Sequence, residues 1–315
     1  MRWRRQPRRL PPRSSGGRGQ GAESVSLDAI WATLESLAGS RLIDLHTHTN
    51  ESDGSCSPAE LIGEAVRAGV GVLGITDHDT FAGYDRAIPL ARQAGVELLR
   101  GIELSTKLHG RSVHLLGYFP GNDELGDFRE WVLGMQSSRR ERNQRLVVRL
   151  RELGFDIRLE EAEARGRGMT GRPHFARIMV EKGYVANIRQ AFDDYLDESA
   201  KGYVYRREPQ FAEGVSRIRA AGGIASLAHP VRIGGDVTAS LPELCAAGLD
   251  AIEAYHSDHA PRETELYLDL ARRYGLKVTG GSDFHGAFKP EVMLGTGLHG
   301  NLSIPREVLE PLRVL

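Results

Sequence analysis

Histidine and acidic side chains recur in short clusters along the chain, each beside a run of apolar residues. The clusters read HTHTNESDG at 46–54, TDHD at 76–79, GIE at 101–103, VHL at 113–115, HP at 229–230 and SDFH at 282–285. Imidazole nitrogens and carboxylate oxygens bind transition metals at roughly 2.0–2.2 Å. The clusters therefore indicate a site that could hold several transition-metal ions.

The spacing within the first cluster supports a shared site. Residues two apart in an extended strand point to the same side and are separated by roughly 6.5 Å, so His46 and His48 can converge on one ion. A single histidine beside an apolar run is usually structural, but six of the eleven histidines occupy such positions next to Asp or Glu. His109, His259 and His299 lie in turn or surface contexts, and we expect them to be structural.

The apolar runs that carry the clusters are short and rich in β-branched residues or leucine, with amphipathic segments between them. We expect seven strands, at 42–45, 71–76, 96–102, 113–118, 224–228, 251–255 and 277–280. Ser57 and Glu60 form a capping-box pattern that opens a helix ending near Gly69, and Pro261 opens one that stops at Gly275. The pattern predicts an α/β barrel of βα units around a parallel sheet, with the polar clusters at one end.

The strand pattern stops between Asp123 and about Glu208, where the sequence becomes arginine-rich and helical. We interpret this segment as a helical insertion that caps the substrate. The expected organisation is a disordered basic tail at 1–26, a first barrel part at 41–122, the insertion at 123–208 and a second barrel part at 209–315.

The charge distribution argues against a broad nucleic-acid-binding face. The formal net charge is −1, but residues 1–26 hold seven arginines and one acid, so 34 basic and 41 acidic residues remain. No run approaches the roughly 18 apolar residues of a spanning helix, and no apolar segment suited to export follows the first arginines. Only two cysteines occur, Cys56 and Cys245, and they form no CxxC pair, which fits a reducing compartment. We therefore expect a cytoplasmic protein with no membrane association. We also expect no obligatory protein partner.

Together the clusters resemble the polymerase-and-histidinol-phosphatase (PHP) family of metal-dependent phosphoesterases over about residues 41–290. The resemblance implies a distorted seven-stranded (β/α)7 barrel and three divalent metal ions, with Mn²⁺ favoured over Fe²⁺ or Zn²⁺. It places His46, His48, Glu103 and Asp283 on the first ion, Glu103, His114 and His229 on the second, and Asp53, His78 and His285 on the third. Glu103 would bridge two ions, and Asp283 would be a catalytic ligand.

Within that family, the helical insertion after VHLLGY and the later GYVYR segment are most similar to the nucleoside 3′,5′-bisphosphate phosphatase branch, whose members also degrade short RNA from the 5′ end. The implied substrate is a small nucleotide, with short 5′-phosphorylated RNA as a second class, and the implied reaction removes the 3′-phosphate.

A bisphosphate also carries a second phosphate that does not react, and arginine suits it because the planar guanidinium can bind two oxygens. We expect Arg142 and Arg172 to bind substrate, with Arg172 just before a helix N-terminus that favours anions. Exposed surface positions are expected instead for Arg139, Arg140 and Arg145. His256, at the end of the sixth strand, is a candidate to bind phosphate or to protonate the leaving oxygen as a catalytic residue, with a structural histidine as the alternative.

The sequence leaves two other functions open. A histidinol-phosphate phosphatase, or another small-molecule phosphomonoesterase, would share the metal ions but needs no nucleobase pocket. An RNA-binding protein that acts through the basic tail would lose its function when residues 1–26 are deleted. The sequence leaves the metal identity, the preferred base and the oligomeric state undetermined.

Overall fold

The seven predicted strands form one sheet, in which each strand pairs with the next along the chain. Their bounds are β1 (Leu42–Thr47), β2 (Val70–Ile75), β3 (Glu97–Leu108), β4 (Arg111–Phe119), β5 (Ile224–Leu227), β6 (Ala251–His256) and β7 (Lys277–Gly281). The structure is a computed structural model that describes residues 41–121, 124–166, 169–233 and 236–312. The predicted basic tail at 1–26 and the expected boundary at 122–123 lie outside the described residues.

The sheet closes into a nearly complete barrel because the chain after β7 returns to β1. The backbone N–H of Asp283 donates to the carbonyl oxygen of His46 at 2.9 Å, and that of His48 donates to Phe284 at 3.0 Å. Gly281 at the end of β7 lies directly against the backbone of His46, where a larger residue would not fit. The expected α/β class with a distorted seven-stranded barrel is confirmed.

Strand β4 runs antiparallel to both of its neighbours, so the expected run of parallel strands is wrong at this position. The chain turns back between β3 and β4 through only His109 and Gly110, both with positive φ, whereas a parallel connection needs a dozen or more residues. β3 also continues well beyond its predicted end at residue 102. As a result His114 lies near the start of β4, opposite Ser105, at the same end of the barrel as Glu103.

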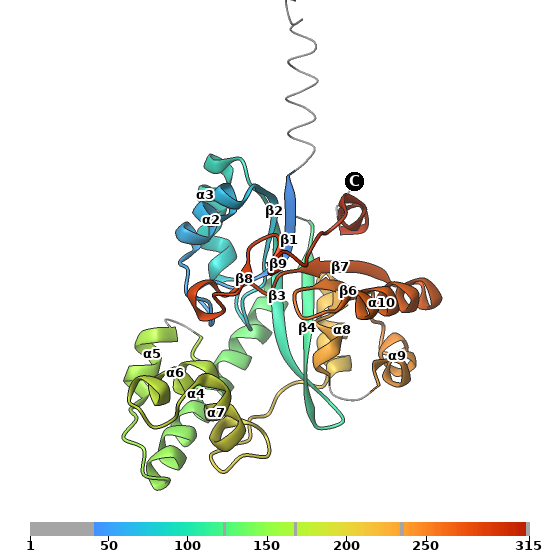
Figure 1. Cartoon of the computed structure of the whole chain (residues 1–315). Helices are drawn as coiled ribbons and strands as arrows, with labels where there is room; N and C mark the ends of the chain where they lie inside the picture. The colour runs from blue at the N-terminus through green and yellow to red at the C-terminus, as the bar shows by residue number, and fades with distance from the viewer. Residues whose placement is uncertain (1–40, 122–123, 167–168, 234–235, 313–315) are drawn as a thin grey trace, which may run out of the picture. The chain divides into compact units, whose positions relative to one another are not determined.

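In the described part of the chain, five helices outside the segment between β4 and α8 surround the barrel (Figure 1). They are α2 (Pro58–Ala68), α3 (Ala82–Ala94), α8 (Phe211–Ala220), α9 (Val237–Ala246) and α10 (Pro261–Tyr274). The capping box of Ser57 and Glu60 opens α2, and Gly69 and Gly275 end α2 and α10 in the left-handed conformation, as predicted. Shorter elements complete the barrel region: η2 (Pro230–Arg232), η3 (Gly286–Phe288), β8 (Val292–Met293), β9 (Gly297–Leu298) and η4 (Arg306–Leu312).

The segment between β4 and α8 is helical and has an apolar core of its own. It holds α4 (Gly126–Glu152), α5 (Leu159–Gly166), α6 (Arg172–Glu181), α7 (Ile188–Ala191) and the π-helical turn η1 (Phe192–Leu196). The first half of α4 packs into the barrel cluster through Phe128 and Val132, and its second half packs into the helical cluster through Leu146 and Leu150. A helix of 27 residues is about 40 Å long, so α4 joins both cores as one rigid element.

The longest helix, α4, is too polar to cross a membrane, because arginine occurs along much of its length. Across the described ranges, no helix combines the length and the apolar character needed to cross a membrane.

The tight contact between β7 and β1 generates a first prediction. A Cβ added to Gly281 would overlap with the backbone nitrogen and the Cβ of His46, so we expect Gly281→Ala to lower the free energy of unfolding by about 1–3 kcal/mol or more. Chemical denaturation would measure this. Gly134→Ala is the control, because Gly134 faces open space within α4 and alanine should be neutral or stabilising by about 0.5–1 kcal/mol. Equal stabilities of the two variants would contradict the prediction.

Candidate metal centre

The nine histidine and acidic residues that the sequence singles out come together at one end of the barrel. We call these residues the ligand cluster: His46, His48, Asp53, His78, Glu103, His114, His229, Asp283 and His285. Each member has a nitrogen or carboxylate oxygen within 4.0 Å of another member. Strand ends and the loops that follow them carry most of the cluster, whereas Glu103 and His114 lie within the β3–β4 hairpin.

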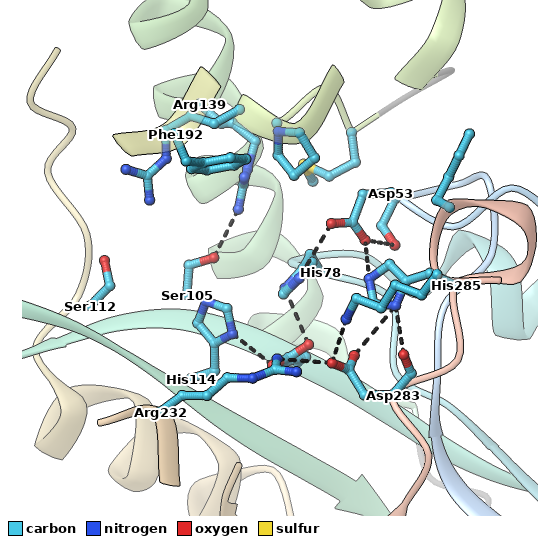
Figure 2. A pocket seen from close by; sticks show the side chains of 18 of the residues that line it. Asp53, His78, Ser105, Ser112, His114, Arg139, Phe192, Arg232, Asp283 and His285 are labelled. Atoms are coloured by element: carbon cyan, nitrogen blue, oxygen red, sulfur yellow. Dashed lines mark hydrogen bonds and ion pairs between the residues drawn. The ribbon is translucent and has the colours of Figure 1, made fainter. Parts of the chain in front are cut away.

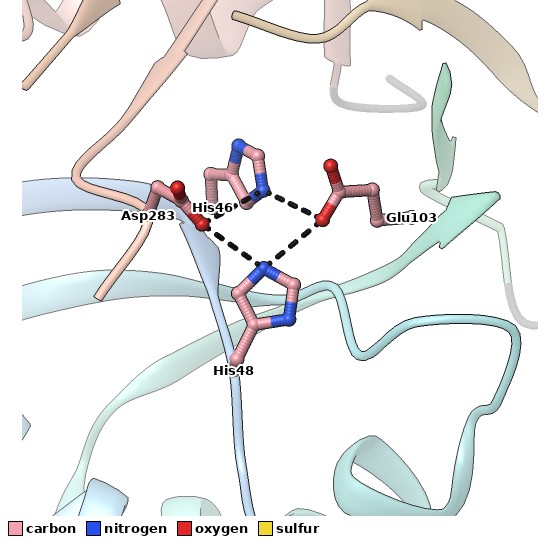
Figure 3. Close-up of side chains that lie close together, drawn as sticks. All are labelled: His46, His48, Glu103 and Asp283. Atoms are coloured by element: carbon pink, nitrogen blue, oxygen red, sulfur yellow. Dashed lines mark hydrogen bonds and ion pairs between the residues drawn. The ribbon is translucent and has the colours of Figure 1, made fainter. Parts of the chain in front are cut away.

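Four members form a closed ring of donor atoms (Figure 3). The Nε2 atom of His46 lies 3.2 Å from a Glu103 oxygen and 3.6 Å from an Asp283 oxygen, and the Nε2 atom of His48 lies 3.1 and 3.3 Å from the same oxygens. Four ligands at 2.0–2.1 Å from one tetrahedral ion would be about 3.3–3.4 Å apart. The ring therefore has the dimensions of a binding site for one transition-metal ion.

The two carboxylate oxygens of Glu103 face different neighbours. Oε1 lies 2.7 Å from His114 Nδ1 and 3.0 Å from His229 Nε2. Oε2 lies within 3.4 Å of ring nitrogens of His46, His48 and His78. One carboxylate can therefore contribute an oxygen to each of two adjacent ions.

Asp53 is the centre of a third group of donors. Its Oδ1 atom lies 3.3 Å from His285 Nε2, and its Oδ2 atom lies 3.7 Å from His78 Nε2. His48 Nδ1 is 3.6 Å from Oδ1, so the third group adjoins the ring in Figure 3.

The protonation and bonding of the cluster fit metal ions. Both ring nitrogens of His48 and the Nδ1 atom of His78 are buried and form no hydrogen bond of good geometry, although carboxylate oxygens lie 3.1–3.6 Å away. Buried nitrogens in this position are costly unless they bind something else. Burial opposes protonation of His48, but the carboxylates of Asp283, Glu103 and Asp53 outweigh it and raise its pKa to about 9, so a metal ion would displace this proton on binding. Burial lowers the pKa of His78 to about 4 and that of His229 to about 3, which favours the neutral form that binds metals.

Glu253 on β6 contacts two members of the ligand cluster and was missed by the sequence reasoning. It is fully buried, and its Oε1 atom lies 2.9 Å from His46 Nδ1 while its Oε2 atom accepts the backbone N–H of His229 at 2.7 Å. A carboxylate on the second nitrogen of a ligating histidine fixes the ring and its tautomer. The signal in the sequence was an acid in the middle of a strand that is otherwise apolar.

Backbone strain is concentrated at this end of the barrel. Asp79, His229 and Asp283 have φ of 52°, 25° and 58°, a region that non-glycine residues seldom occupy. Two of the three belong to the ligand cluster, and the third follows His78 directly. Such outliers persist where surrounding contacts fix them, typically at functional sites.

A cavity of about 400 Å³ extends from the ligand cluster to the helical segment (Figure 2). Asp53, His78 and Asp283 lie on its barrel side, and Arg139 and Phe192 lie on the helical side. The candidates Arg142 and Arg172 both line it. Arg172 is the first residue of α6 and donates from Nη1 to the Leu196 oxygen at 3.0 Å, which anchors one side of its guanidinium.

The prediction of an exposed Arg139 is wrong, whereas Arg140 and Arg145 are exposed as expected. The Arg139 side chain is 11 % exposed and forms an ion pair with Asp79 and a hydrogen bond to Ser105, which together compensate for its burial. Arg139 lies three positions before Arg142, on the same face of α4, and that spacing was the available signal.

Arg206 is a second buried arginine that sequence reasoning missed. It is 3 % exposed and pairs with Glu208 at 2.7 Å and Asp79 at 3.6 Å. Burial and the neighbouring guanidiniums of Arg139, Arg172 and Arg206 lower the pKa of Arg142 well below its usual value. We refer to Arg139, Arg142, Arg172 and Arg206 as the arginine cluster.

The remaining histidines lie outside the cavity wall. His256 is 2 % exposed, accepts the Asp258 backbone N–H at its Nδ1 atom, and has Nε2 3.8 Å from an Asp283 oxygen. Asp283 lines the cavity, whereas His256 lies beside it and does not line the cavity. The contact of His256 with phosphate or the leaving oxygen stays a prediction. His259 closes a turn, as expected, because its N–H donates to the His256 oxygen at 3.1 Å, but its side chain is buried with Nδ1 2.9 Å from the Ala254 oxygen. His109 and His299 are exposed residues with positive φ.

Comparison with known proteins gives consistent relatives. Residues 44–160 match the model of the PHP domain. The chain is 34 % identical to a 5′-3′ exoribonuclease of Haemophilus influenzae over 77 % of its own length and 89 % of the relative. It is 33 % identical to a phosphoribosyl 1,2-cyclic phosphate 1,2-diphosphodiesterase of Eggerthella lenta (78 % and 94 % covered) and 32 % identical to a 3′,5′-nucleoside bisphosphate phosphatase of Chromobacterium violaceum (77 % and 87 %).

A solved structure agrees with the sequence relatives. The crystal structure of a protein described as a metal-dependent phosphoesterase from Bifidobacterium adolescentis superposes with a TM-score of 0.74 at 32 % identity. The match covers 88 % of this chain and 98 % of that one.

Metal binding to the ligand cluster predicts a stability change. Adding Mn²⁺ at about 100 times its dissociation constant to chelator-treated protein should stabilise the fold by about 2.7 kcal/mol, and raise the melting temperature on the order of 5–10 °C. His48→Ala should lose most of that rise because it removes a ring ligand. His109→Ala, which removes an exposed histidine, should keep it. Equal rises in the two variants would exclude the ring as the metal site.

The position of Glu253 predicts an effect on affinity. Glu253→Gln should weaken metal binding about 10- to 100-fold, because His46 loses the carboxylate that orients it. Isothermal titration calorimetry would measure the dissociation constant. Glu243→Gln is the matched control, because Glu243 pairs with His109 on the surface. An unchanged affinity in Glu253→Gln would show that His46 is oriented by other contacts.

Proposed function

Because the chain belongs to the PHP family of metal-dependent phosphoesterases, we propose that it removes the 3′-phosphate from nucleoside 3′,5′-bisphosphates and also accepts short 5′-phosphorylated RNA. The observation that carries the proposal is the cavity between the ligand cluster and the arginine cluster. A substrate with one reacting phosphate and one other phosphate would match these two walls.

The charge balance of the arginine side supports an anionic substrate. The network around the arginine cluster contains five cations and three carboxylates: Lys107, Arg139, Arg142, Arg172, Arg206, Asp79, Glu198 and Glu208. The excess of two positive charges matches a phosphate monoester, which carries about −1.5 to −2 at pH 7. Within the described residues, the Arg142 side chain donates one hydrogen bond, from Nε to Asn143 Oδ1 at 3.0 Å, so the rest of its fork is available to oxygen atoms in the cavity.

Apolar side chains line the same cavity and suit a nucleobase. Ile188, Phe192 and Phe288 lie on its wall, and stacking of a base on an aromatic ring contributes about 1–3 kcal/mol. Histidinol phosphate, the alternative substrate, offers neither a second phosphate nor a purine or pyrimidine face. The named activities of the bacterial relatives agree with a nucleotide substrate.

We propose that the ligand cluster holds three divalent ions, with Mn²⁺ favoured, and that Glu103 contributes to two of them. Bound ions would lower the pKa of water toward 7 and neutralise phosphoryl oxygens. Arg232 and Lys289 lie 2.9 and 2.6 Å from the Asp283 Oδ2 atom on the cavity wall, where they hold this carboxylate in position and add positive charge beside the reacting phosphate. The arginine cluster would orient the substrate by its other phosphate.

The proposal places the activity in the barrel and the helical segment. The body of the chain outside residues 1–26 is acidic, and both Cys56 and Cys245 are free thiols, which fits a cytoplasmic enzyme.

If RNA binding through the basic tail were the function, deletion of residues 1–26 would abolish it; we expect that deletion to leave bisphosphate hydrolysis intact.

A substrate panel tests the proposed function. The full chain with Mn²⁺ would be offered a nucleoside 3′,5′-bisphosphate, a nucleoside 3′-monophosphate, histidinol phosphate, phosphoribosyl 1,2-cyclic phosphate and a short 5′-phosphorylated RNA. We expect the highest kcat/KM for the bisphosphate, measured as released phosphate, and nucleoside 5′-monophosphates from the RNA. A higher kcat/KM for histidinol phosphate or the cyclic phosphate would replace the proposal with that activity.

A substitution in the arginine cluster tests phosphate recognition. Arg142→Lys keeps the charge but loses the bidentate fork, so kcat/KM for the bisphosphate should fall about 10- to 100-fold, equivalent to about 1.4–2.8 kcal/mol. Hydrolysis of the 3′-monophosphate should change little. Arg140→Lys, on the same helix but exposed and paired with Glu163, is the control. If Arg142→Lys impairs both substrates equally, Arg142 does not bind the second phosphate.

A further inference from the structure

Asp79 connects the ligand cluster to the arginine cluster. It is fully buried and directly follows His78 in the chain. Its Oδ2 atom forms an ion pair with Arg139 and lies 3.6 Å from Arg206. Its Oδ1 atom accepts the backbone N–H of Ser105 at 2.9 Å.

The backbone of Asp79 is bonded to both sides as well. Its N–H donates to the carbonyl oxygen of Glu103 at 3.0 Å, and its own carbonyl oxygen accepts from Gln136 Nε2 at 2.9 Å. Gln136 and Arg139 lie three residues apart on α4, so Asp79 holds this helix at two points. Asp79 also holds β3 at Glu103, the residue whose carboxylate is central to the ligand cluster.

These bonds fix the direction of the Arg139 guanidinium. Its Nη2 atom contacts Asp79 and also donates to the Ser105 hydroxyl at 2.9 Å, as the dashed line in Figure 2 shows. The same side chain lines the cavity. A guanidinium held on one side by two acceptors can present its remaining N–H groups to a ligand at little further entropic cost.

We propose that Asp79 is a positioning residue that fixes the separation between the arginine cluster and the ligand cluster, and so selects substrates with a second phosphate. This inference rests on the proposed function and adds a specificity determinant to it. The φ of 52° at Asp79 agrees, because a non-glycine residue is held in this conformation only where its surroundings require it.

The choice of substitution follows from that backbone. Asparagine tolerates positive φ better than most residues, so Asp79→Asn keeps the turn and the acceptor for Ser105 while it removes the negative charge that holds Arg139 and Arg206. Asp85→Asn is the matched control, because Asp85 forms an ion pair with Arg129 of the same helix α4 at 2.8 and 2.9 Å, but on the surface.

The experiment assays the metal-loaded full chain with two substrates and one product. For Asp79→Asn we expect KM for the nucleoside 3′,5′-bisphosphate to rise about tenfold or more, with a much smaller change for the 3′-monophosphate. The affinity for a nucleoside 5′-monophosphate, which carries only the second phosphate, should fall by a similar factor in calorimetry. Metal content should stay at the wild-type value. The control Asp85→Asn should match wild type in every measurement.

The outcomes separate the two proposals. If wild type does not prefer the bisphosphate, the proposed function fails, while the binding of the 5′-monophosphate still tests Asp79. If wild type prefers the bisphosphate but Asp79→Asn weakens both substrates equally or loses metal, Asp79 serves the ligand cluster only and the inference is wrong. Unchanged kinetics and affinity would also overturn it.

A second variant covers the case in which Asp79→Asn does not fold, because it leaves Arg139 and Arg206 buried without this partner. Ser105→Ala removes only the other acceptor of Arg139, a hydroxyl. We expect it to shift KM for the bisphosphate about three- to fivefold, with the 3′-monophosphate nearly unchanged. No selective shift in Ser105→Ala would overturn the proposed fixation of Arg139.

Discussion

The carboxylate of Glu103 is buried among five histidine rings, and the rest of the site depends on how that charge is neutralised. An ionised carboxylate in an apolar interior is costly unless cations surround it. Burial alone would raise the pKa of Glu103, but His78, His114 and His46 lower it well below the usual value. The raised pKa values of His46 and His48 indicate protonated rings that supply part of this charge, and bound metal ions would supply it more completely.

The same requirement explains the second layer of carboxylates and hydroxyls around the ligand cluster. Glu253 orients His46, while Asp44, fully buried on β1, accepts bonds from the Ser282 backbone and hydroxyl beside Asp283. Burial raises the pKa of Asp44 to about 6 in spite of these bonds. An acid whose pKa is raised on folding makes the fold less stable as pH rises from about 4 to 6. The barrel thus accepts a cost in stability to keep the loop after β7 in place.

The sequence predicted the ligand cluster well because each member lies beside an apolar run, and the strand pattern brings such positions to one end. It did not predict the direction of β4, since a two-residue turn at His109 and Gly110 carries no strong signal without a glycine or asparagine first. The burial of Arg139 and of Glu253 was not predicted, for another reason. Both are charged residues whose burial depends on partners distant in sequence, Asp79 and His46, and a local pattern does not reveal those pairs.

The reversal of β4 explains why the arginine cluster can lie opposite the ligand cluster. β3 and β4 extend past Glu103 as a hairpin, and near its tip Lys107 and Ser112 contact Glu198 of the helical segment. β4 then carries the chain back past Glu103, and α4 returns toward the site with its first half packed on the barrel. Arg139 and Arg142 fall near the middle of α4, between its two cores, so packing on both sides sets their positions. A parallel β4 would leave the chain at the ligand-cluster end, without a long helix anchored in both cores. The cavity is therefore a consequence of one tight turn and one long helix, which together place positive charge opposite the ligand cluster.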